Sequence, residues 1–473
     1  MRSPFFDRRF NKVGKRLTAN TLDKQDNRLF YSQMISITIP VMLQQMVAVG
    51  LNLVDTIMVG KLSANALAGV GAANQIYFIY SVAMFGVFSG AAVHAVQYYG
   101  VKDLVNFRKI MGLDYIMCFA LTIPTIIIAV LFGPQLVGLF TDEPDVIELG
   151  VQYLEIACIS YVFSGISFVI TYNSRSVAIL KVPTTISISA VLVNVCLNYC
   201  LIYGKFGFPE LGVRGAALAT LIARICESGA MLSYIYIFSK EHPLKARISE
   251  MIHIEKDMFI RVMKTATPVI CNEGLWAISN AIVFAIYGQI SAAALAIVQI
   301  ANTVTEVFQT LYAGMSNASS VLIGRALGRG ERELAYKYAL KMIKLTVIFN
   351  IFTMTLLIIA IWPIAGIYGF DADTTDMLIK SLLVFAAAQL PKMLVYMLVC
   401  GILRSGGDTV WCLIMEFIFN FCCQIGLAFL AVNIFGLPLY LAIAVVMLAE
   451  TMKSVVVIIR VFSKKWMHVF TGR

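Results

Sequence analysis

Residues 37–60 read ITIPVMLQQMVAVGLNLVDTIMVG, a stretch apolar enough to lie in a bilayer although it carries four polar side chains. At 100° per residue, Gln44, Gln45, Asn52 and Asp55 fall within an arc of about 100° on a helix, so they form one polar stripe. An ionised Asp in hydrocarbon costs at least ~2.5 to 3.5 kcal/mol on insertion scales. We therefore expect the stripe to face a water-filled cavity or a partner helix, with Asp55 as a functional candidate. The alternative is that Asp55 lies at the membrane interface, near the helix end.

The composition indicates a polytopic membrane protein. The 473-residue chain is 59% hydrophobic and only 14% charged, with a mean hydropathy of +0.82, which excludes a soluble globular protein with an ordinary surface. The ten cysteines lie in apolar segments and are expected to pack there rather than form disulfides. No cleavable signal peptide is expected, because the N-terminal segment is basic and polar. The net charge of +10 is expected to face anionic lipid, with no nucleic-acid partner.

Twelve apolar stretches of about twenty or more residues are long enough to cross a membrane. They cover residues 32–59, 66–98, 110–132, 146–172, 183–203, 212–238, 262–287, 293–323, 338–362, 377–403, 409–432 and 437–462. Most Lys and Arg lie in the termini and in every second loop, whereas the other loops hold Lys61, Lys205 and Arg214. By the positive-inside rule, we expect a multi-pass cell-membrane protein with both termini in the cytoplasm.

The chain contains an internal sequence repeat, with one copy in each half. A shift of 228 residues aligns Pro40 with Pro268, Gly60 with Gly288, Ser63 with Ser291, Asn74 with Asn302, Gly86 with Gly314 and Gly100 with Gly328, and a shift of 229 aligns Arg175-Ser176 with Arg404-Ser405. This agreement indicates duplication. Each half has six spans, so the two repeats are parallel. The predicted organisation is an N-terminal cytoplasmic segment (1–31), an N-lobe (32–238), a cytoplasmic linker (239–261), a C-lobe (262–463) and a cytoplasmic tail (464–473).

The second half repeats the polar stripe. Asn272, Glu273 and Asn280 stand where the first half has Gln44, Gln45 and Asn52, while Val283 replaces Asp55. In transporters built from such repeats, the substrate lies between the halves near the membrane midplane. The residues predicted to line this cavity are Gln44, Gln45, Asn52, Asn272, Trp276, Asn280, Gln299, Asn302 and Lys392. An aromatic face such as that of Trp276 could hold a cation there.

Several motifs resemble those of the multidrug and toxic compound extrusion (MATE) transporters. They are Ile39-Pro40 with Val54-Asp55-Thr56 and Gly60, the run GFPELGVRGAA at residues 207–217, Pro268 with Glu273, and LRSGGDT at residues 403–409. The resemblance covers nearly the whole chain after the N-terminal segment. It implies an all-α, V-shaped pair of six-helix bundles that exports organic cations or other amphipathic compounds in exchange for protons or sodium ions.

The resemblance also implies which residues couple transport to an ion. Asp55 is similar to the coupling acid of the family's first helix, and Asn194, Asn198 and Thr220 are similar to its N-lobe neighbours. In some branches of the family the position of Asn198 is an acid, so the choice between proton and sodium stays open. A carboxylate with only amide neighbours in a partly dry bundle suits a proton carrier, which makes protons the first expectation.

Glu273 resembles the C-lobe coupling acid of another branch, whose second acid is replaced here by Lys392. At ~1.5 Å per residue, both residues lie roughly 16 Å from the cytoplasmic ends of their helices. An unpaired ammonium at that depth is expensive, so we expect a buried Glu273–Lys392 ion pair, the alternative being that Lys392 lines open water. A cavity with apolar walls, acids and few basic groups favours bulky, amphipathic, often cationic substrates.

Three functions are compatible with these features. The first is a secondary antiporter for amphipathic small molecules. We expect no enzyme activity and no ATP hydrolysis, because residues 401–409 lack the lysine and the spacing of a P-loop. Neither a cofactor nor a clustered metal site is expected. The second is a flippase for a lipid-linked precursor, which an Arg-rich portal and two extra helices would favour. The third, a receptor or scaffold without transport, is disfavoured by the acids in both halves. The oligomeric state stays open, a monomer included.

Overall fold

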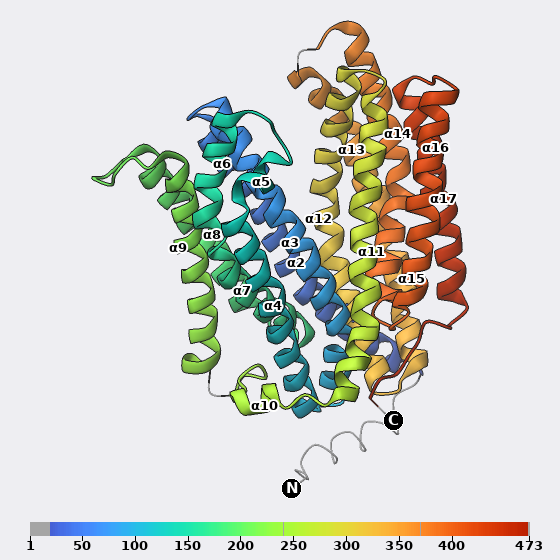
Figure 1. The fold of residues 1–473 in the computed structure, drawn as a ribbon. Coiled ribbons are helices and arrows are strands. Elements are labelled where there is room, and N and C mark those ends of the chain that lie inside the picture. Colours follow the sequence, from blue (N-terminus) through green and yellow to red (C-terminus); the bar gives the residue numbers. More distant parts are fainter. Residues whose placement is uncertain (1–18, 240, 369, 472–473) are drawn as a thin grey trace.

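The computed structural model describes residues 19–239, 241–368 and 370–471, and within these ranges the chain folds into helices and connecting turns without a β-strand. The helices of the first lobe (Figure 1) are α2 (Ala19–Gly60), α3 (Ala64–Gly100), α4 (Leu104–Leu131), α5 (Gly133–Gly138), α6 (Pro144–Ala157), α7 (Ser160–Ser176), α8 (Lys181–Tyr203) and α9 (Gly212–Ser233), which ends in the wider helical turn η1 (Tyr234–Phe238). α6 and α7 form one span bent by 53°. The short α10 (Ile248–Ile252) lies in the linker between the lobes.

The second lobe repeats this arrangement. Its helices are α11 (Lys256–Gly288), α12 (Ala292–Gly328), α13 (Arg332–Tyr368), α14 (Ala372–Tyr396) with η2 (Met397–Leu403), the continuous run α15 (Thr409–Glu416), η3 (Phe417–Gln424), α16 (Ile425–Phe429) and η4 (Leu430–Ile434), and α17 (Leu439–Phe462). The π-helical segments η2 and η3 interrupt long helices, which is a common feature near functional sites.

The predicted spans all correspond to helices. In the described chain, ten helical segments are long and apolar enough to cross a membrane, and the bent pair α6–α7 adds an eleventh. α12 accounts for the remaining predicted span, since its 37 residues extend about 55 Å at ~1.5 Å per residue, more than the thickness of a bilayer core. The expectation of twelve spans in an all-α fold agrees with this arrangement.

The second helix of each lobe begins in the same way. Ser63 Oγ accepts a hydrogen bond from the Ala66 amide at 3.0 Å before α3, and Ser291 Oγ accepts one from the Ala294 amide at 3.0 Å before α12. Each serine satisfies one of the free amides at the helix N-terminus. The two caps occupy equivalent positions of the sequence repeat, so the duplication extends to local structure.

The lobes meet along two equivalent helix pairs, α2 with α12 and α3 with α11. A β-carbon at Gly90 of α3 would overlap the backbone of Ala266 in α11, and one at Gly314 of α12 would overlap Thr38 in α2. Glycine therefore permits the close helix contact that small residues provide in membranes. Figure 1 shows the two lobes converging at one end of the molecule and separating at the other, which gives the predicted V shape.

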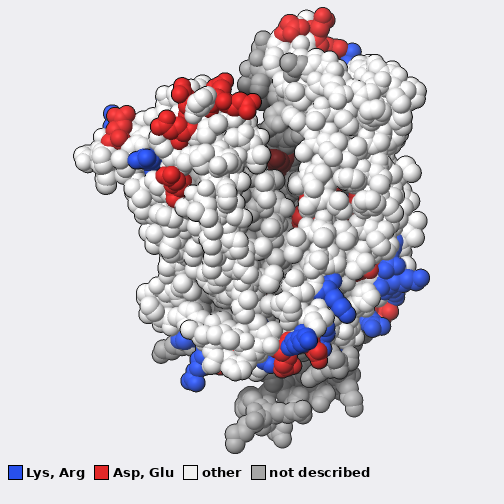
Figure 2. Space-filling model, viewed as in Figure 1, with Lys and Arg blue, Asp and Glu red and all other residues white. Residues whose placement is uncertain are grey.

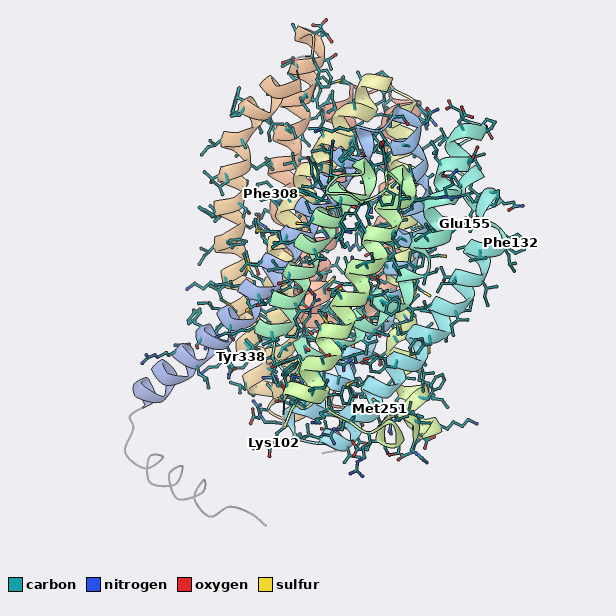
Figure 3. All side chains as sticks on the ribbon, turned by 90° about the vertical axis from the view of Figure 1, so that its left-hand side faces the viewer. Lys102, Phe132, Glu155, Met251, Phe308 and Tyr338 are labelled. Carbon is teal, nitrogen blue, oxygen red and sulfur yellow. The ribbon has the colours of Figure 1, made fainter. Side chains whose placement is uncertain are left out.

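The two ends of the molecule differ in charge. Figure 2 shows Lys and Arg gathered at the end where the lobes converge, Asp and Glu gathered where they separate, and a hollow between the lobes. In Figure 3, Lys102 and Met251 lie at the converging end and Phe132 lies far from it. The linker is held at this basic end, where Arg108 pairs with Glu250 at 2.9 Å.

Candidate coupling site and central cavity

Asp55 lies beside two asparagines of α8. Asn198 Nδ2 donates to Asp55 Oδ1 at 2.6 Å and lies 3.3 Å from Asn194 Oδ1, while Asn194 Nδ2 lies 3.3 Å from Thr220 Oγ1 on α9. With its amide turned by 180°, Asn194 donates to both Asp55 carboxylate oxygens at 3.3 Å. Both asparagines are buried, and Asp55 is half-buried. The structure therefore brings together the four N-lobe residues that the family resemblance selected.

The polar stripe of α2 faces α8. Gln44 Nε2 donates to Ser187 Oγ at 3.2 Å, and Asp55 accepts from Asn198 eleven residues further along each helix. The two contacts are thus separated by the same distance, about three helical turns, on α2 and on α8. The two helices therefore run side by side in the same direction. The stripe thus meets a partner helix, as the cost of placing amides and a carboxylate in hydrocarbon requires.

A chain of polar contacts continues from α8 to α9. Ser187 Oγ donates to Glu227 Oε1 at 2.7 Å, and Arg224 Nη1 pairs with Glu227 Oε2 at 2.7 Å. Arg224 and Glu227 lie three residues apart, so they share one face of α9. Thr220, which contacts Asn194 of the Asp55 cluster, lies four residues before Arg224 on the same helix. Polar groups therefore connect the neighbourhood of Asp55 with Gln44.

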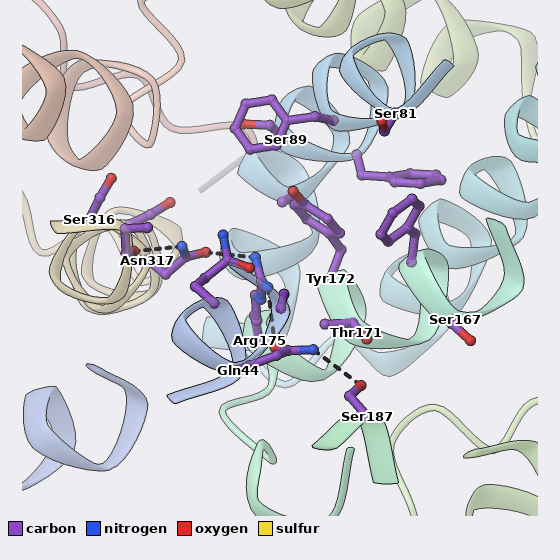
Figure 4. Close-up of a pocket in the computed structure, with 18 of the residues that line it drawn as sticks. Gln44, Ser81, Ser89, Ser167, Thr171, Tyr172, Arg175, Ser187, Ser316 and Asn317 are labelled. Carbon is purple, nitrogen blue, oxygen red and sulfur yellow. Dashed lines mark hydrogen bonds between the residues drawn. The ribbon is translucent and has the colours of Figure 1, made fainter. Parts of the chain in front are cut away.

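A cavity of about 420 Å³ lies between the lobes, a volume in the usual range for small-molecule sites. Its lining comes from α2, α3, α7, α8 and α9 of the first lobe and from α12, α14 and the end of η2 in the second. Three of the residues predicted to line a cavity do so, namely Gln44, Gln45 and Asn52. Figure 4 shows Gln44 there, between Arg175 and Ser187.

The other predicted cavity residues lie outside this lining. Asn272 is buried, Trp276 is 37% exposed, Asn280 and Gln299 are exposed, and Asn302 and Lys392 are half-buried. Within the α11 stripe, Asn272 faces α15, because its Nδ2 donates to the Cys412 carbonyl at 3.4 Å. The neighbouring Ser279 Oγ donates to the Asn420 carbonyl of η3 at 2.6 Å. The run α15–η4 is the fifth span of the second lobe, as α8 is of the first, so equivalent stripes face equivalent helices, although only the stripe of α2 lines the cavity.

Glu273 forms an ion pair with Arg404, not with Lys392. Arg404 Nη2 lies 2.7 Å from Glu273 Oε1 and 2.9 Å from Asn272 Oδ1, and Arg404 Nη1 donates to Ser89 Oγ of the first lobe at 3.3 Å. The Arg404 side chain is 3% exposed. The expected Glu273–Lys392 pair is therefore wrong.

Lys392 lies on α14, which packs against α12, α13 and α17. Its ammonium interacts electrostatically with Glu450 of α17 and Glu306 of α12. Depth along a helix follows from the sequence, but the side of the helix that meets a given neighbour follows from how the bundle packs. Equal depth therefore did not place Lys392 beside Glu273.

The cavity contains more positive charge than expected. Arg175, Arg224 and Arg404 line it with one carboxylate, that of Glu227, so the expectation of few basic groups is wrong. The match of Arg175 with Arg404 near the repeat offset was the signal that could have identified both residues. Arg224 and Glu227 pair with each other at the cavity wall.

Two parallel repeats that enclose a cavity, with a carboxylate held by amides in one lobe, define a polytopic membrane transporter. The MatE family model matches residues 40–200 and 268–430, one copy in each lobe, and the two matches begin 228 residues apart. The chain therefore belongs to the MatE family of multidrug efflux transporters.

Relatives and solved structures agree with this assignment. The chain is 24% identical over 456 residues to a probable multidrug resistance protein NorM of Thermotoga maritima, covering 95% of this chain and 96% of the relative. It is 26% identical over 389 residues to the multidrug resistance protein NorM of Photobacterium profundum, covering 80% and 82%. A crystal structure of a MATE protein in the bent conformation superposes with a TM-score of 0.83 at 17% identity, covering 92% of this chain and 96% of that one. The similarity confirms the V-shaped fold, and the comparisons do not favour the flippase alternative.

Proposed function

We propose that the protein exports amphipathic small molecules by alternating access in exchange for protons bound at Asp55. The main support is the geometry of the Asp55 carboxylate, which accepts a 2.6 Å hydrogen bond from Asn198 and has no cation within ion-pair distance among the described residues. Binding one proton or one monovalent cation neutralises such a carboxylate without breaking an ion pair. This is the property that an exchangeable coupling site needs.

The arrangement of the lobes supports movement between two access states. The lobes contact each other through α2–α12 and α3–α11, the two pairs related by the sequence repeat. Rocking one lobe against the other about these pairs would close the cavity on one side and open it on the other. In the state described here, the lobes separate at the acidic end (Figure 2).

The charge distribution supports a cytoplasmic basic end, with both chain termini on that side. Cytoplasmic segments of membrane proteins are enriched in Lys and Arg. Residues 1–18 and 472–473 lie outside the described residues. A C-terminal fusion to a fluorescent protein should fluoresce, whereas a fusion to alkaline phosphatase should be inactive. The opposite pattern would overturn this orientation.

Exchange of a proton for a substrate also requires that the charge state of Asp55 affects the cavity in which the substrate binds. Contacts lead from Arg224 through Glu227 and Ser187 to Gln44, which lines the cavity, and Arg224 lies one helical turn from Thr220 of the Asp55 cluster. These contacts support such a connection. A change in the charge of Asp55 alters the balance of forces on Arg224, and hence on its ion pair with Glu227.

The test is substrate movement in proteoliposomes that contain the purified protein, with a proton gradient or a sodium gradient imposed separately. The wild type should move rhodamine B, an amphipathic dye that carries both an aromatic cation and a carboxylate, in response to the proton gradient. Asp55→Asn should lose this response while still binding the dye. Asp114→Asn is a matched control, since Asp114 is a buried carboxylate of the same lobe that accepts a hydrogen bond from Asn173 at 2.8 Å and does not line the cavity. Wild-type rates in Asp55→Asn would refute the assignment, and a response to sodium alone would refute the choice of ion.

A further inference from the structure

The charged side chains at the cavity do not balance. Arg224 pairs with Glu227 at 2.7 Å, and Arg404 pairs with Glu273 at 2.7 Å. Arg175, the third arginine of the lining, has no carboxylate partner among the described residues. The wall of the cavity thus carries one positive charge that no carboxylate in the described part of the chain neutralises.

Arg175 is held in place by neutral groups. Arg175 Nη1 lies 3.5 Å from Asn317 Oδ1 and Arg175 Nη2 lies 3.5 Å from Gln44 Oε1, both at the outer limit of a hydrogen bond. The guanidinium carbon lies 4.8 Å from the centre of the Tyr172 ring, and the buried Nε has no hydrogen-bond partner. Figure 4 shows this guanidinium between Gln44 and Asn317, beside Tyr172. Its hydrogen-bonding capacity is therefore largely unused.

The sequence repeat explains the missing carboxylate. Arg175 and Arg404 are equivalent, as are Gln44 and Asn272, and each arginine contacts the amide of its own lobe. Glu273, the partner of Arg404, corresponds to Gln45 in the first lobe. Gln45 also lines the cavity but carries no charge. The second lobe thus supplies its own carboxylate, whereas the first lobe has an uncharged amide in that place.

We propose that Arg175 binds the acidic group of an amphipathic substrate, such as a carboxylate, so that the substrates are organic anions or zwitterions rather than simple cations. A guanidinium binds a carboxylate through two parallel, charge-assisted hydrogen bonds. The aromatic side chains of Tyr77, Phe85 and Tyr172 line the same cavity and would contact the apolar part of the molecule. This inference rests on the proposed export function and specifies its substrate class.

Binding of the acidic group also affects a contact between the lobes. Asn317 belongs to α12 of the second lobe, so its 3.5 Å hydrogen bond with Arg175 crosses the interface. A substrate carboxylate would replace this weak contact with a stronger one inside the first lobe. Occupancy of the site would therefore favour separation of the lobes at this position.

The test is equilibrium binding to the full chain in nanodiscs, measured by fluorescence anisotropy without any ion gradient. The two probes are rhodamine B, which has a free carboxylate, and its ethyl ester, which lacks that negative charge but keeps the same aromatic cation. We expect the wild type to bind rhodamine B more tightly than the ester. Arg175→Gln should weaken rhodamine B binding about tenfold or more, the equivalent of one charge-assisted hydrogen bond, and change ester binding less than twofold.

A second variant tests the same idea while keeping Arg175. Gln45→Glu places a carboxylate where the second lobe has Glu273, so it should pair with Arg175 and weaken rhodamine B binding selectively. Equal binding of the two dyes by the wild type, or equal losses for both dyes in Arg175→Gln, would overturn the proposal. Selective binding of rhodamine B by a protein that shows no gradient-driven export would support this site and count against the antiport mechanism, so the two proposals fail separately.

Discussion

The ion pair between Glu273 and Arg404 is predicted to be a major stabilising contact of the second lobe. The Arg404 side chain is 3% exposed and that of Glu273 is 18% exposed, so Glu273→Gln leaves a charged guanidinium buried among uncharged oxygens only, those of Asn272, Ser89 and the new amide. Breaking one half of a buried pair typically costs about 3 to 5 kcal/mol. We expect a loss near the lower value, because the two neutral contacts remain.

A double-mutant cycle measures this interaction. Glu273→Gln, Arg404→Gln and the double variant are unfolded by sodium dodecyl sulfate in mixed micelles, and tryptophan fluorescence gives the free energy of unfolding. The double variant should lose less than the sum of the single losses, with a coupling energy of about 2 kcal/mol. The matched control combines Glu273→Gln with Lys392→Met, whose losses should add. Additive losses for Glu273 and Arg404, or coupling between Glu273 and Lys392, would show that the assigned partner is incorrect.

Three further predictions concern the contacts that hold the basic end together. Gly90→Val should lower the melting temperature and abolish export because its side chain would overlap α11, whereas Gly71→Val, where a β-carbon touches nothing within 4 Å, should leave both unchanged. Gln97→Ala should speed trypsin cleavage after Lys465, since the Gln97 amide donates to the His468 carbonyl at 3.0 Å and accepts from the Phe470 amide at 2.8 Å; an unchanged rate would mean that these bonds do not hold the tail. Burial lowers the pKa of His242 in the linker, so the unfolded linker binds a proton more tightly than the folded linker does. The stability of the folded linker therefore falls as the pH drops below about 6.5. Hydrogen exchange, corrected for intrinsic rates, should show this loss in the wild type and not in His242→Gln.

The internal duplication shows how much of the fold follows from the sequence. The span of each helix depends on the length of its apolar run, and the agreement of Ser63 with Ser291 and of Gly86 with Gly314 at one offset is sufficient to predict two parallel lobes. These features are local or periodic, so they need no knowledge of which helices touch.

The Asp55 cluster could be anticipated for a related reason. Asn194 and Asn198 lie one turn apart on the same face of a helix, and the polar stripe of α2 needs a polar partner in an apolar bundle, so few arrangements satisfy both helices. The family resemblance identified that partner, and the structure places Asn198 2.6 Å from Asp55. Whether this cluster carries the coupling ion stays a prediction.

The partners of Glu273 and the charge of the cavity were decided by tertiary structure alone. Sequence determines how deep Glu273 and Lys392 lie along their helices, but the rotation and the neighbours of each helix depend on packing between segments far apart in the chain. Arg404 and Glu273 are 131 residues apart in the sequence, and Arg175 and Asn317 belong to different lobes. Periodicity along one helix carries no information about such contacts, because their energy depends on which surfaces meet.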